Sequence, residues 1–548
     1  MFFRGERSLK AGDSISFDTY FNGFFYTKYR ELTKVRTIRF SCDFKGKAIV
    51  RLCVFDGEES VISETEGEGH TELSAELSRL SETGFLYPKI TAVTDTEFLC
   101  GEYSSECEPK EINVAVAICT FKREKYVTKN IEVLKSYEFS FINRLFVVDN
   151  GQTLDVKSIS DDFVSVLPNR NYGGSGGFTR GLIEAHDGGY SHIILMDDDV
   201  EFYPETLEQM TVFISLLREE FSESKFSAAM LPISEETPYL QYEMGAFYDG
   251  MKNIASKGDV DIRDREALLD ALDNSGIQYG AWWCFCMPVS AMEKGLPYPF
   301  FIKFDDVEYG LRTCKSSEII TMNGIAVYHE PFDKKMSIAL EYYILRNRLM
   351  VNAVHGYGKS SAMKIVFYEW GKNLILYRYD NLPNVFRAVN DFLTGPDFFL
   401  NCDEEKLNGE LFSSSPKFVP LDSLEGWDEA LKCDDRIPDR KMKASMVLTM
   451  GGHLIPSFLL KKEITAFPFA RAGIWDCAGK KAVIQYQLDG NTGIITRRSF
   501  VKFLKYGFMT VFYLSKLFFR YGKVSSEYVR RKEEITSFEF WKRHLGIE

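Results

Sequence analysis

The first 108 residues alternate short apolar runs with polar breaks. Runs such as TIRFSCDF, AIVRLCVFD and FLYPKITAV are rich in β-branched and aromatic residues, and clusters of Gly and Asp separate them. This spacing is typical of short strands joined by turns. The pattern predicts an N-terminal β-sandwich over residues 1–108.

The pattern changes over residues 109–400. Four apolar runs, at 112–120, 144–151, 163–169 and 192–199, alternate with segments of helical length. Alternation of strand and helix predicts an α/β domain with a Rossmann-like, mostly parallel sheet. Such sheets bind ligands beyond the carboxyl ends of their strands, where polar residues of this region are concentrated.

Residues 401–548 have a mixed pattern and predict a mainly helical C-terminal domain. The stretch AVIQYQLDGNTGIITRRSF fits a β-hairpin around Asp489-Gly490. The stretch FVKFLKYGFMTVFYLSKLFFRYGK that follows fits a basic amphipathic helix, too interrupted by charge to cross a membrane. We therefore expect the chain to end in a basic amphipathic tail.

Charge narrows the range of partners. The net charge of −13 argues against nucleic acid. Residues 498–548 nevertheless hold eleven Lys and Arg against five Asp and Glu, which predicts contact with an anionic surface such as the inner face of the cytoplasmic membrane. The start MFFRGERSLK lacks the apolar core of a secretory signal, and eleven scattered cysteines indicate no disulfide framework. We expect a cytoplasmic protein, peripheral on that membrane.

Three adjacent aspartates follow the apolar run that ends at Met196. Because residues i and i+2 of a strand end point to the same side, Asp197 and Asp199 can together hold a divalent cation that relieves their repulsion. His329 ends another apolar run and could complete the site. Two alternatives remain: an acidic turn that caps the next helix, and a phosphatase of the haloacid dehalogenase type, in which the first aspartate would be a nucleophile.

Three further stretches carry candidate chemistry. PNRNYGGSGGFTRG, at 168–181, predicts either a loop whose backbone approaches an anionic ligand or a plain tight turn. Trp282 and Trp283 offer a flat face for a sugar ring, with core packing as the alternative. FIKFDDVEYGLR reads as a strand that ends in Asp305 and Asp306, a candidate general base or a helix cap.

The motifs AICTFKR, VVDNG, NYGGSGGFTRG, LMDDDV, WWCFCMP, FIKFDDVEYGLR, YHEPF and YYILRNRL occur in this order. Together they resemble family 2 glycosyltransferases of the GT-A fold, above all the polymerising galactofuranosyltransferases and related enzymes of O-antigen and capsule synthesis. DTYFNGFFYTKY resembles the start of that group's N-terminal β-sandwich. Trp541, Leu545 and Gly546 match its closing W-x-x-x-L-G.

The resemblance implies a role for each candidate residue. The metal ligands would be Asp197, Asp199 and His329. The donor-binding residues would be Thr120, Arg123, Asp149, Asn171 and Asp198, of which Asp198 would face the donor sugar. Trp282 and Trp283 would bind the acceptor, Asp306 would be the catalytic base, and Asp305 would position acceptor hydroxyls. The implied cofactor is Mn²⁺ or Mg²⁺, and the implied reaction is a single displacement that inverts the anomeric centre.

The resemblance also implies partners. The first choice of donor is UDP-galactofuranose, with dTDP-rhamnose as the alternative, and the acceptor would be a lipid-linked, growing cell-surface glycan. A homo-oligomer is left open. An alternative of another class is a non-catalytic glycan-binding protein that uses the sandwich and the tryptophans.

Overall fold

The structure is a computed structural model that describes residues 7–234, 236–271, 276–314, 319–331, 337–432, 440–470, 475 and 477–547. The backbone divides into two compact units. The first comprises Met1–Arg170, Gly177–Leu296 and Tyr309–Glu330, and the second comprises Asn171–Gly176, Pro297–Glu308 and Pro331–Glu548. The division into three domains at residues 108 and 400 stays a prediction.

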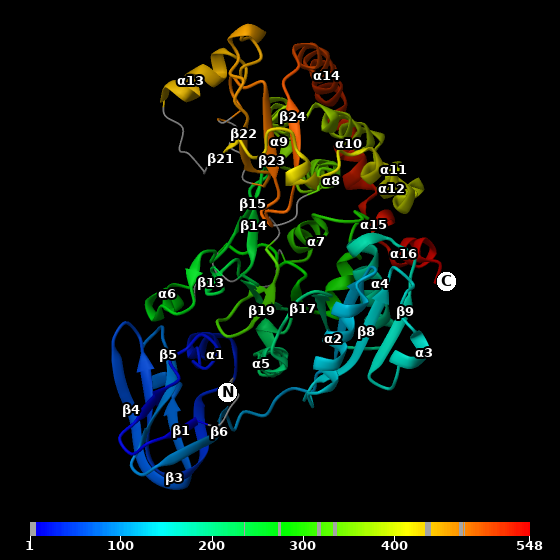
Figure 1. Ribbon diagram of the computed structural model, residues 1–548. Coiled ribbons are helices and arrows are strands. Elements are labelled where there is room, and N and C mark those ends of the chain that lie inside the picture. The colour runs from blue at the N-terminus through cyan, green and yellow to red at the C-terminus, as the bar shows by residue number, and fades with distance from the viewer. Residues whose placement is uncertain are drawn as a thin grey trace. The chain divides into compact units, whose positions relative to one another are not determined.

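The N-terminal part of the first unit is a β domain, coloured blue in Figure 1. Its elements are β1 (Arg7–Leu9), β2 (Ser14–Ser16), α1 (Tyr26–Leu32), β3 (Thr37–Phe55), β4 (Glu59–Glu76), β5 (Phe85–Ala92) and β6 (Thr96–Ser104). The strands pair in the order β1-β6-β3-β5-β2, and β4 also pairs with β3. Along β3 buried and less buried side chains alternate, as the apolar pattern predicts.

The predicted sandwich would consist of two separate sheets, but the long strand β3 connects the strands of this domain. Its first half pairs with β6 and its second half with β5, while β4 runs along most of its length. The register shifts between Asp43 and Lys47, where an irregularity of this kind bends a strand. The predicted β domain is therefore present, and hydrogen bonds through β3 join its six strands into one sheet.

The second sheet of the first unit has the predicted mostly parallel core. Its strands are β7 (Val114–Thr120), β8 (Ile142–Asp149), β9 (Val164–Pro168), β10 (His192–Asp197), β11 (Lys225–Ser227), β17 (Cys284–Pro288) and β18 (Ile319–Ile320). They lie in the order β18-β11-β17-β10-β7-β8-β9. The four strands β10, β7, β8 and β9 are parallel, whereas β17 runs antiparallel to both of its neighbours.

Smaller elements complete the first unit. They are α2 (Glu124–Lys135), α3 (Val156–Ile159), α5 (Pro204–Ser215), β12 (Ala229–Pro232), β13 (Leu240–Gln241), β14 (Ala246–Tyr248), β15 (Asn253–Ala255), β16 (Val260–Asp261), α6 (Arg265–Asp270) and β19 (Ala326–His329). Strand β19 pairs in parallel with β12 and ends in His329. The β domain contacts α5 through the rings of Tyr29 and Phe213, whose centroids are 4.8 Å apart.

The glycine-rich stretch forms the start of helix α4 (Gly173–Asp187), which corrects the predicted loop. A Cβ atom on Gly177 would lie 2.1 Å from the Cys119 sulfur, and one on Gly181 would lie 2.5 Å from Cβ of Ala117. Both neighbours belong to β7, which the helix approaches more closely than any side chain at these positions would allow. These two glycines therefore serve helix–strand packing.

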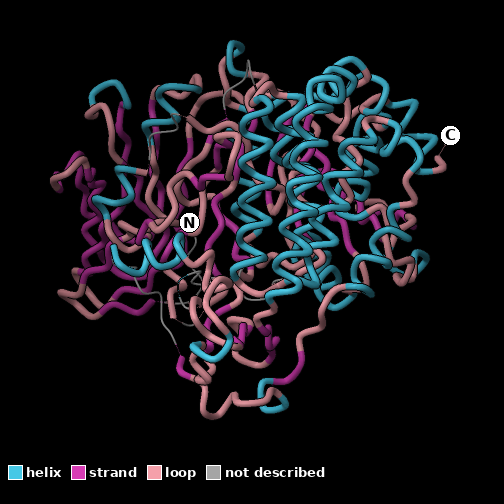
Figure 2. Tube along the Cα trace, turned by 90° about the horizontal axis from the view of Figure 1, so that it is seen from above, coloured by secondary structure: helices cyan, strands magenta, loops and turns pink. Residues whose placement is uncertain are grey.

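The second unit combines a helical layer with a small mixed sheet. Its helices are α8 (Leu340–Val354), α9 (Gly358–Ile375), α10 (Leu382–Thr394), α11 (Asp397–Asn401), α12 (Glu404–Ser414), α13 (Arg440–Leu448), α14 (Phe500–Arg530), α15 (Lys532–Ile535) and α16 (Phe538–Leu545). Helices α8, α9, α10 and α14 pack on one another, and Figure 2 shows long helices running side by side.

The sheet of the second unit contains the predicted hairpin. Its strands β20 (Val419–Pro420), β21 (Leu431–Lys432), β22 (Thr465–Pro468), β23 (Ala482–Tyr486) and β24 (Thr492–Arg497) lie in the order β20-β24-β23-β22-β21. Strands β23 and β24 are antiparallel, and the turn between them contains Gly490 at a φ of 71°. The sequence signal for this turn is thus confirmed.

The strand predicted before Asp305 is wrong. Phe301–Phe304 forms a turn in which Phe301, Lys303 and Phe304 have φ values of 69°, 69° and 70°. Helix α7 (Asp305–Thr313) starts directly afterwards, with acidic residues in its first turn. Carboxylates are favourable at a helix N-terminus because the unpaired backbone N–H groups there carry partial positive charge.

Two properties of the described part of the chain bear on its environment. None of its helices combines the length and the apolar character that crossing a lipid bilayer requires. The ten cysteines in this part are free thiols.

We predict that Gly181→Ala destabilises the first unit although alanine favours helix. The added methyl group would overlap Ala117, and such overpacking costs about 1–3 kcal/mol. Gly371→Ala in α9 is the matched control, because a Cβ there meets nothing within 4 Å and should gain up to about 1 kcal/mol. Thermal unfolding of both variants tests this. A Gly181→Ala protein that melts at or above the wild-type temperature would show that the close packing is not required.

Candidate functional site

The ends of β10 and β19 bring together the three predicted metal ligands. Nε2 of His329 lies 3.3 Å from a carboxylate oxygen of Asp199 and 3.9 Å from one of Asp197. One ligand atom from each of the three residues lies within 4.8 Å of the others. Two carboxylates and an imidazole at these separations form a donor set that suits Mn²⁺ or Mg²⁺.

The charges of this cluster act on one another. Burial alone would raise the pKa of Asp199, but contacts with His329 and Arg123 outweigh it and lower that pKa to about 2. Burial would likewise lower the pKa of His329, yet the hydrogen bond to Asp199 and the charge of Asp197 raise it. His329 Nδ1 contacts the Glu330 carbonyl oxygen at 2.6 Å, which leaves Nε2 directed to the carboxylates.

The middle aspartate has partners of its own beside the candidate metal ligands. Asp198 is 6% exposed and accepts hydrogen bonds from the Thr120 hydroxyl at 2.7 Å and from the Arg123 guanidinium at 3.2 Å. Burial raises the pKa of Asp198, which these two donors oppose. The predicted donor-binding residues Thr120, Arg123 and Asp198 are therefore neighbours. Whether Asp198 faces a donor sugar stays a prediction.

Arg123 links Asp198 to the metal ligands. Its guanidinium contacts both Asp198 and Asp199, and its side chain is 48% exposed. The cation thus balances part of the negative charge at this sheet edge. Because half of the side chain is in solvent, it can leave the carboxylates when another cation takes its place.

Asp149 lies at the end of β8, as predicted, but its carboxylate is engaged locally. One oxygen accepts from the backbone N–H of Gly151, and the other accepts from the N–H groups of Thr153 and Leu154. The side chain is 1% exposed. In this structure Asp149 shapes the turn after β8, and its predicted contact with the base or ribose of a nucleotide stays a prediction.

The paired tryptophans are largely buried. Trp282 and Trp283 are 5% and 4% exposed. The indole N–H of Trp283 donates to the Ala228 carbonyl, and the ring of Trp282 meets Phe178 and Tyr309 edge to face. Packing therefore accounts for most of both rings, and the predicted acceptor platform stays a prediction.

Asn171, Asp305 and Asp306 belong to the second unit. The Asn171 side chain accepts from the N–H of Gly173, in the turn before α4. Asp305 is buried, Asp306 is half-buried, and one Asp306 oxygen accepts from the N–H of Val307. Burial raises the pKa of both carboxyls, and for Asp305 the charge of Asp306 adds to this. A raised pKa favours proton exchange near neutral pH.

Two polar contacts beside the candidate site residues were not predicted from the sequence. Asn130 of α2 donates to the Asp198 carbonyl oxygen at 2.9 Å and is 2% exposed. Nε2 of His355 lies 3.2 Å from the Glu308 carboxylate, two residues after Asp306 in α7. Asn130 lies inside α2 and His355 directly follows α8, and a single polar residue at either place is too common a signal to identify its partner.

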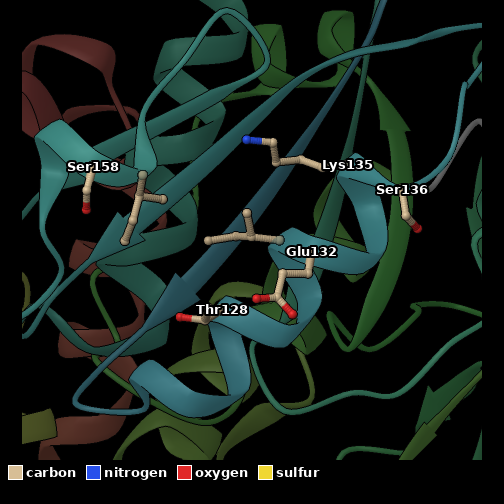
Figure 3. Close-up of a pocket in the computed structure, with 7 residues that line it drawn as sticks. Thr128, Glu132, Lys135, Ser136 and Ser158 are labelled. Carbon is tan, nitrogen blue, oxygen red and sulfur yellow. The ribbon is translucent and has the colours of Figure 1, made fainter.

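A surface hollow of the first unit lies apart from the candidate residues. It is lined by Thr128, Ile131, Glu132, Lys135, Ser136, Ser158 and Ile159, and Figure 3 shows these side chains on α2 and α3. None of the predicted site residues lines it. The hollow is therefore separate from the candidate metal ligands at the ends of β10 and β19.

Comparisons with known proteins agree with this architecture. Residues 115–217 match the model of glycosyl transferase family 2, and residues 2–106 match the galactofuranosyltransferase 2 N-terminal model. Galactofuranosyltransferase GlfT2 of Mycolicibacterium smegmatis is 28% identical over 71% of this chain and 66% of its own length. GlfT2 of Mycobacterium tuberculosis is 26% identical over 74% and 69%. The match thus spans about two thirds of each relative.

Solved structures are more distant. The mannosyltransferase PcManGT from Pyrobaculum calidifontis, in complex with GDP-Man and Mn²⁺, is 13% identical, with a TM-score of 0.31 over 52% of this chain and 77% of its own. At that TM-score the likeness carries no conclusion about this chain. The two family models and the homology to GlfT2, together with the observed sheet, confirm the predicted family and fold class. Residues 115–217 are thus a family 2 glycosyltransferase domain of GT-A architecture, and this domain follows an N-terminal domain of the galactofuranosyltransferase 2 type.

Proposed function

We propose that this chain is an inverting, metal-dependent glycosyltransferase that transfers galactofuranose from UDP-galactofuranose to a hydroxyl of a growing cell-surface glycan. The observation that carries the proposal is the cluster of Asp197, Asp199 and His329 at the carboxyl ends of β10 and β19. The homology to GlfT2 supports the choice of donor sugar. The alternative donor is dTDP-rhamnose, and a non-catalytic glycan-binding protein is disfavoured by an intact set of metal ligands.

The residues of this chain divide the chemistry. When bound, a divalent cation would neutralise the diphosphate that leaves with the nucleoside. Asp197, Asp199 and His329 would hold it, and Thr120 and Arg123 lie beside them, where they can orient the donor.

The second half of the reaction falls to the paired carboxylates. Asp306 takes the proton of the acceptor hydroxyl. At the same time the oxygen of that hydroxyl forms the new bond to C1 of the sugar, and the bond from C1 to the UDP oxygen breaks. The electron pair of that bond leaves with UDP. Because attack comes from the face opposite the leaving group, one displacement inverts the anomeric centre.

A panel of nucleotide sugars with Mn²⁺ and an oligosaccharide acceptor tests the reaction. We expect free UDP and a lengthened glycan with UDP-galactofuranose only. Release of dTDP from dTDP-rhamnose would support the alternative donor. Phosphate release from simple phosphomonoesters, without sugar transfer, would instead support the dehalogenase-type chemistry.

We predict that Asp199→Asn abolishes metal binding and transfer while the fold persists. The substitution keeps the shape but removes a ligand charge, and even an outer partner of a metal ligand contributes about 10–100-fold to affinity, so the loss should be at least that large. Glu201→Gln is the control. Glu201 lies two residues after Asp199, is exposed and forms an ion pair with Lys129. Calorimetry with Mn²⁺ and turnover measure both variants. Full activity of the wild type after exhaustive EDTA dialysis would refute metal dependence.

We further propose that helix α14 holds the enzyme at the inner face of the cytoplasmic membrane, near a lipid-linked acceptor. The helix buries one face, including Phe503, Tyr506 and Leu517. Its other face is apolar too, with Phe508 and Phe519 exposed at 76% and 82%. An exposed aromatic face of this kind is typical of helices that lie in a membrane interface.

Fewer basic residues of α14 are available to an anionic membrane than the sequence predicts. Lys502 pairs with Asp380, and Lys516 donates to the Asn390 side chain. Lys505 and Arg530 are exposed. Each basic residue near an anionic leaflet contributes about 1 kcal/mol, so apolar burial must provide most of the attachment.

Vesicle sedimentation tests the membrane proposal. The wild type should bind vesicles with anionic lipid, less so with neutral lipid or at high salt. Combined Phe508→Ser, Phe512→Ser and Phe519→Ser should remove binding, whereas Phe412→Ser on α12, also an exposed aromatic, should not. If the triple variant binds as well as wild type, or if it instead dissociates an oligomer, the exposed face of α14 is not a membrane anchor.

A further inference from the structure

The turn that leads into the paired carboxylates has an unfavourable backbone. Phe301, Lys303 and Phe304 all have left-handed φ values, near 70°, and Asp305 and Asp306 follow directly. Such a conformation costs about 1–3 kcal/mol for each bulky residue and persists only where the surroundings impose it. Contacts within the second unit must therefore hold this turn.

One buried side chain holds three carbonyls of the turn. The amide nitrogen of Asn347, in α8, donates to the carbonyl oxygens of Lys303 at 2.7 Å, Ile302 at 3.0 Å and Phe300 at 3.4 Å. Asn347 is 0% exposed. The carbonyls of Phe300, Ile302 and Lys303 converge on one donor group because the chain folds back on itself here, which the left-handed residues make possible.

Arg346 fixes the orientation of this amide. Its Nε donates to the Asn347 side-chain oxygen at 2.9 Å, so the nitrogen of Asn347 must face the turn. A second guanidinium nitrogen donates to the Phe300 carbonyl at 2.7 Å. The two neighbours in α8 thus act as one unit on the chain before Asp305.

The environment of Arg346 keeps it in place. The side chain is 1% exposed, and no carboxylate of the described residues lies within ion-pair distance of it. Its guanidinium carbon instead lies 5.1–5.3 Å from the ring centroids of Tyr342, Tyr343, Phe398 and Phe399. In such an apolar setting the hydrogen bonds of a cation are strong, because no water competes for them.

The other side of the turn is held by the residues that start α4. The Ser175 hydroxyl donates to the Tyr298 carbonyl at 2.6 Å, and its N–H donates to the Phe301 carbonyl at 3.2 Å. A Cβ on Gly173 would lie 2.1 Å from that Phe301 oxygen. The turn is therefore confined from two directions, and the amide of Asn347 reaches the carbonyls of Ile302 and Lys303, shortly before Asp305.

We propose that Asn347, oriented by Arg346, is the positioning residue that sets the place of Asp305 and Asp306. This inference rests on the proposed function, in which Asp306 is the general base. Proton transfer requires heavy atoms about 2.6–3.2 Å apart, and a misplacement of about 1 Å costs roughly 10²-fold in rate. Loss of the hydrogen bonds that Asn347 donates should therefore reduce kcat and leave the affinity for the nucleotide sugar unchanged.

Asn347→Asp tests this with little change in size. The new carboxylate cannot donate, and it repels the three carbonyl oxygens. Asn352→Asp is the matched control, because Asn352 lies in the same helix, is 0% exposed and donates to the Ser361 hydroxyl at 3.0 Å. We expect Asn347→Asp to lower kcat about 10–100-fold while its affinity for UDP stays within about twofold of wild type. Asp306→Asn should likewise lose kcat and keep its affinity for UDP. Asn352→Asp should lower the melting temperature but change kcat less than threefold.

A second measurement is independent of the reaction. Deuterium uptake of the peptide that covers residues 300–307 should rise in Asn347→Asp, and to a smaller degree in Arg346→Lys, but not in Asn352→Asp. Unchanged uptake, or equal kcat in the Asn347 and Asn352 variants, would overturn the positioning role. Raised uptake in a protein that transfers no sugar, even as wild type, would overturn the proposed function and leave the positioning role standing.

Discussion

Repulsion among the three aspartates at the end of β10 is the constraint on which the candidate site of the first unit depends. Carboxylates at the end of a buried strand are stable only where each has a partner. The structure gives each of them a partner: Asp197 and Asp199 lie near His329, and Asp198 accepts a hydrogen bond from Thr120. The ends of β7, β10 and β19 must therefore meet at one place, and the sheet order provides this for the first two.

The glycines of α4 are part of the same requirement. Strand β7 is central, with β10 and β8 as neighbours, so its faces must be covered. Without side chains at Gly177 and Gly181, α4 lies directly on Cys119 and Ala117. The covered strand then presents Thr120 at its end, where the hydroxyl reaches Asp198. A packing feature within the helix thus fixes a polar contact in the site.

Sequence patterns predicted those parts of the molecule that depend on local order. Continuous apolar runs identified the parallel strands, and their polar ends identified Asp197, Asp199 and His329. The turn at Phe301–Phe304 was missed because apolar residues before two aspartates look the same there as in β10. Its conformation is held by Asn347 and Ser175, both distant in sequence, and no local pattern contains such partners. The burial of Trp283 is likewise set by partners distant in sequence.

The two groups of carboxylates differ in how firmly they are held, and the physics of their proposed tasks explains why. Attraction between a cation and its ligands falls only gradually with distance, so a half-exposed Arg123 can share the candidate metal ligands and give way. Proton transfer tolerates much smaller errors in position. A strained turn fixed by a fully buried amide is therefore suited to Asp306, whereas the same rigidity around Asp199 would hinder the exchange of one cation for another.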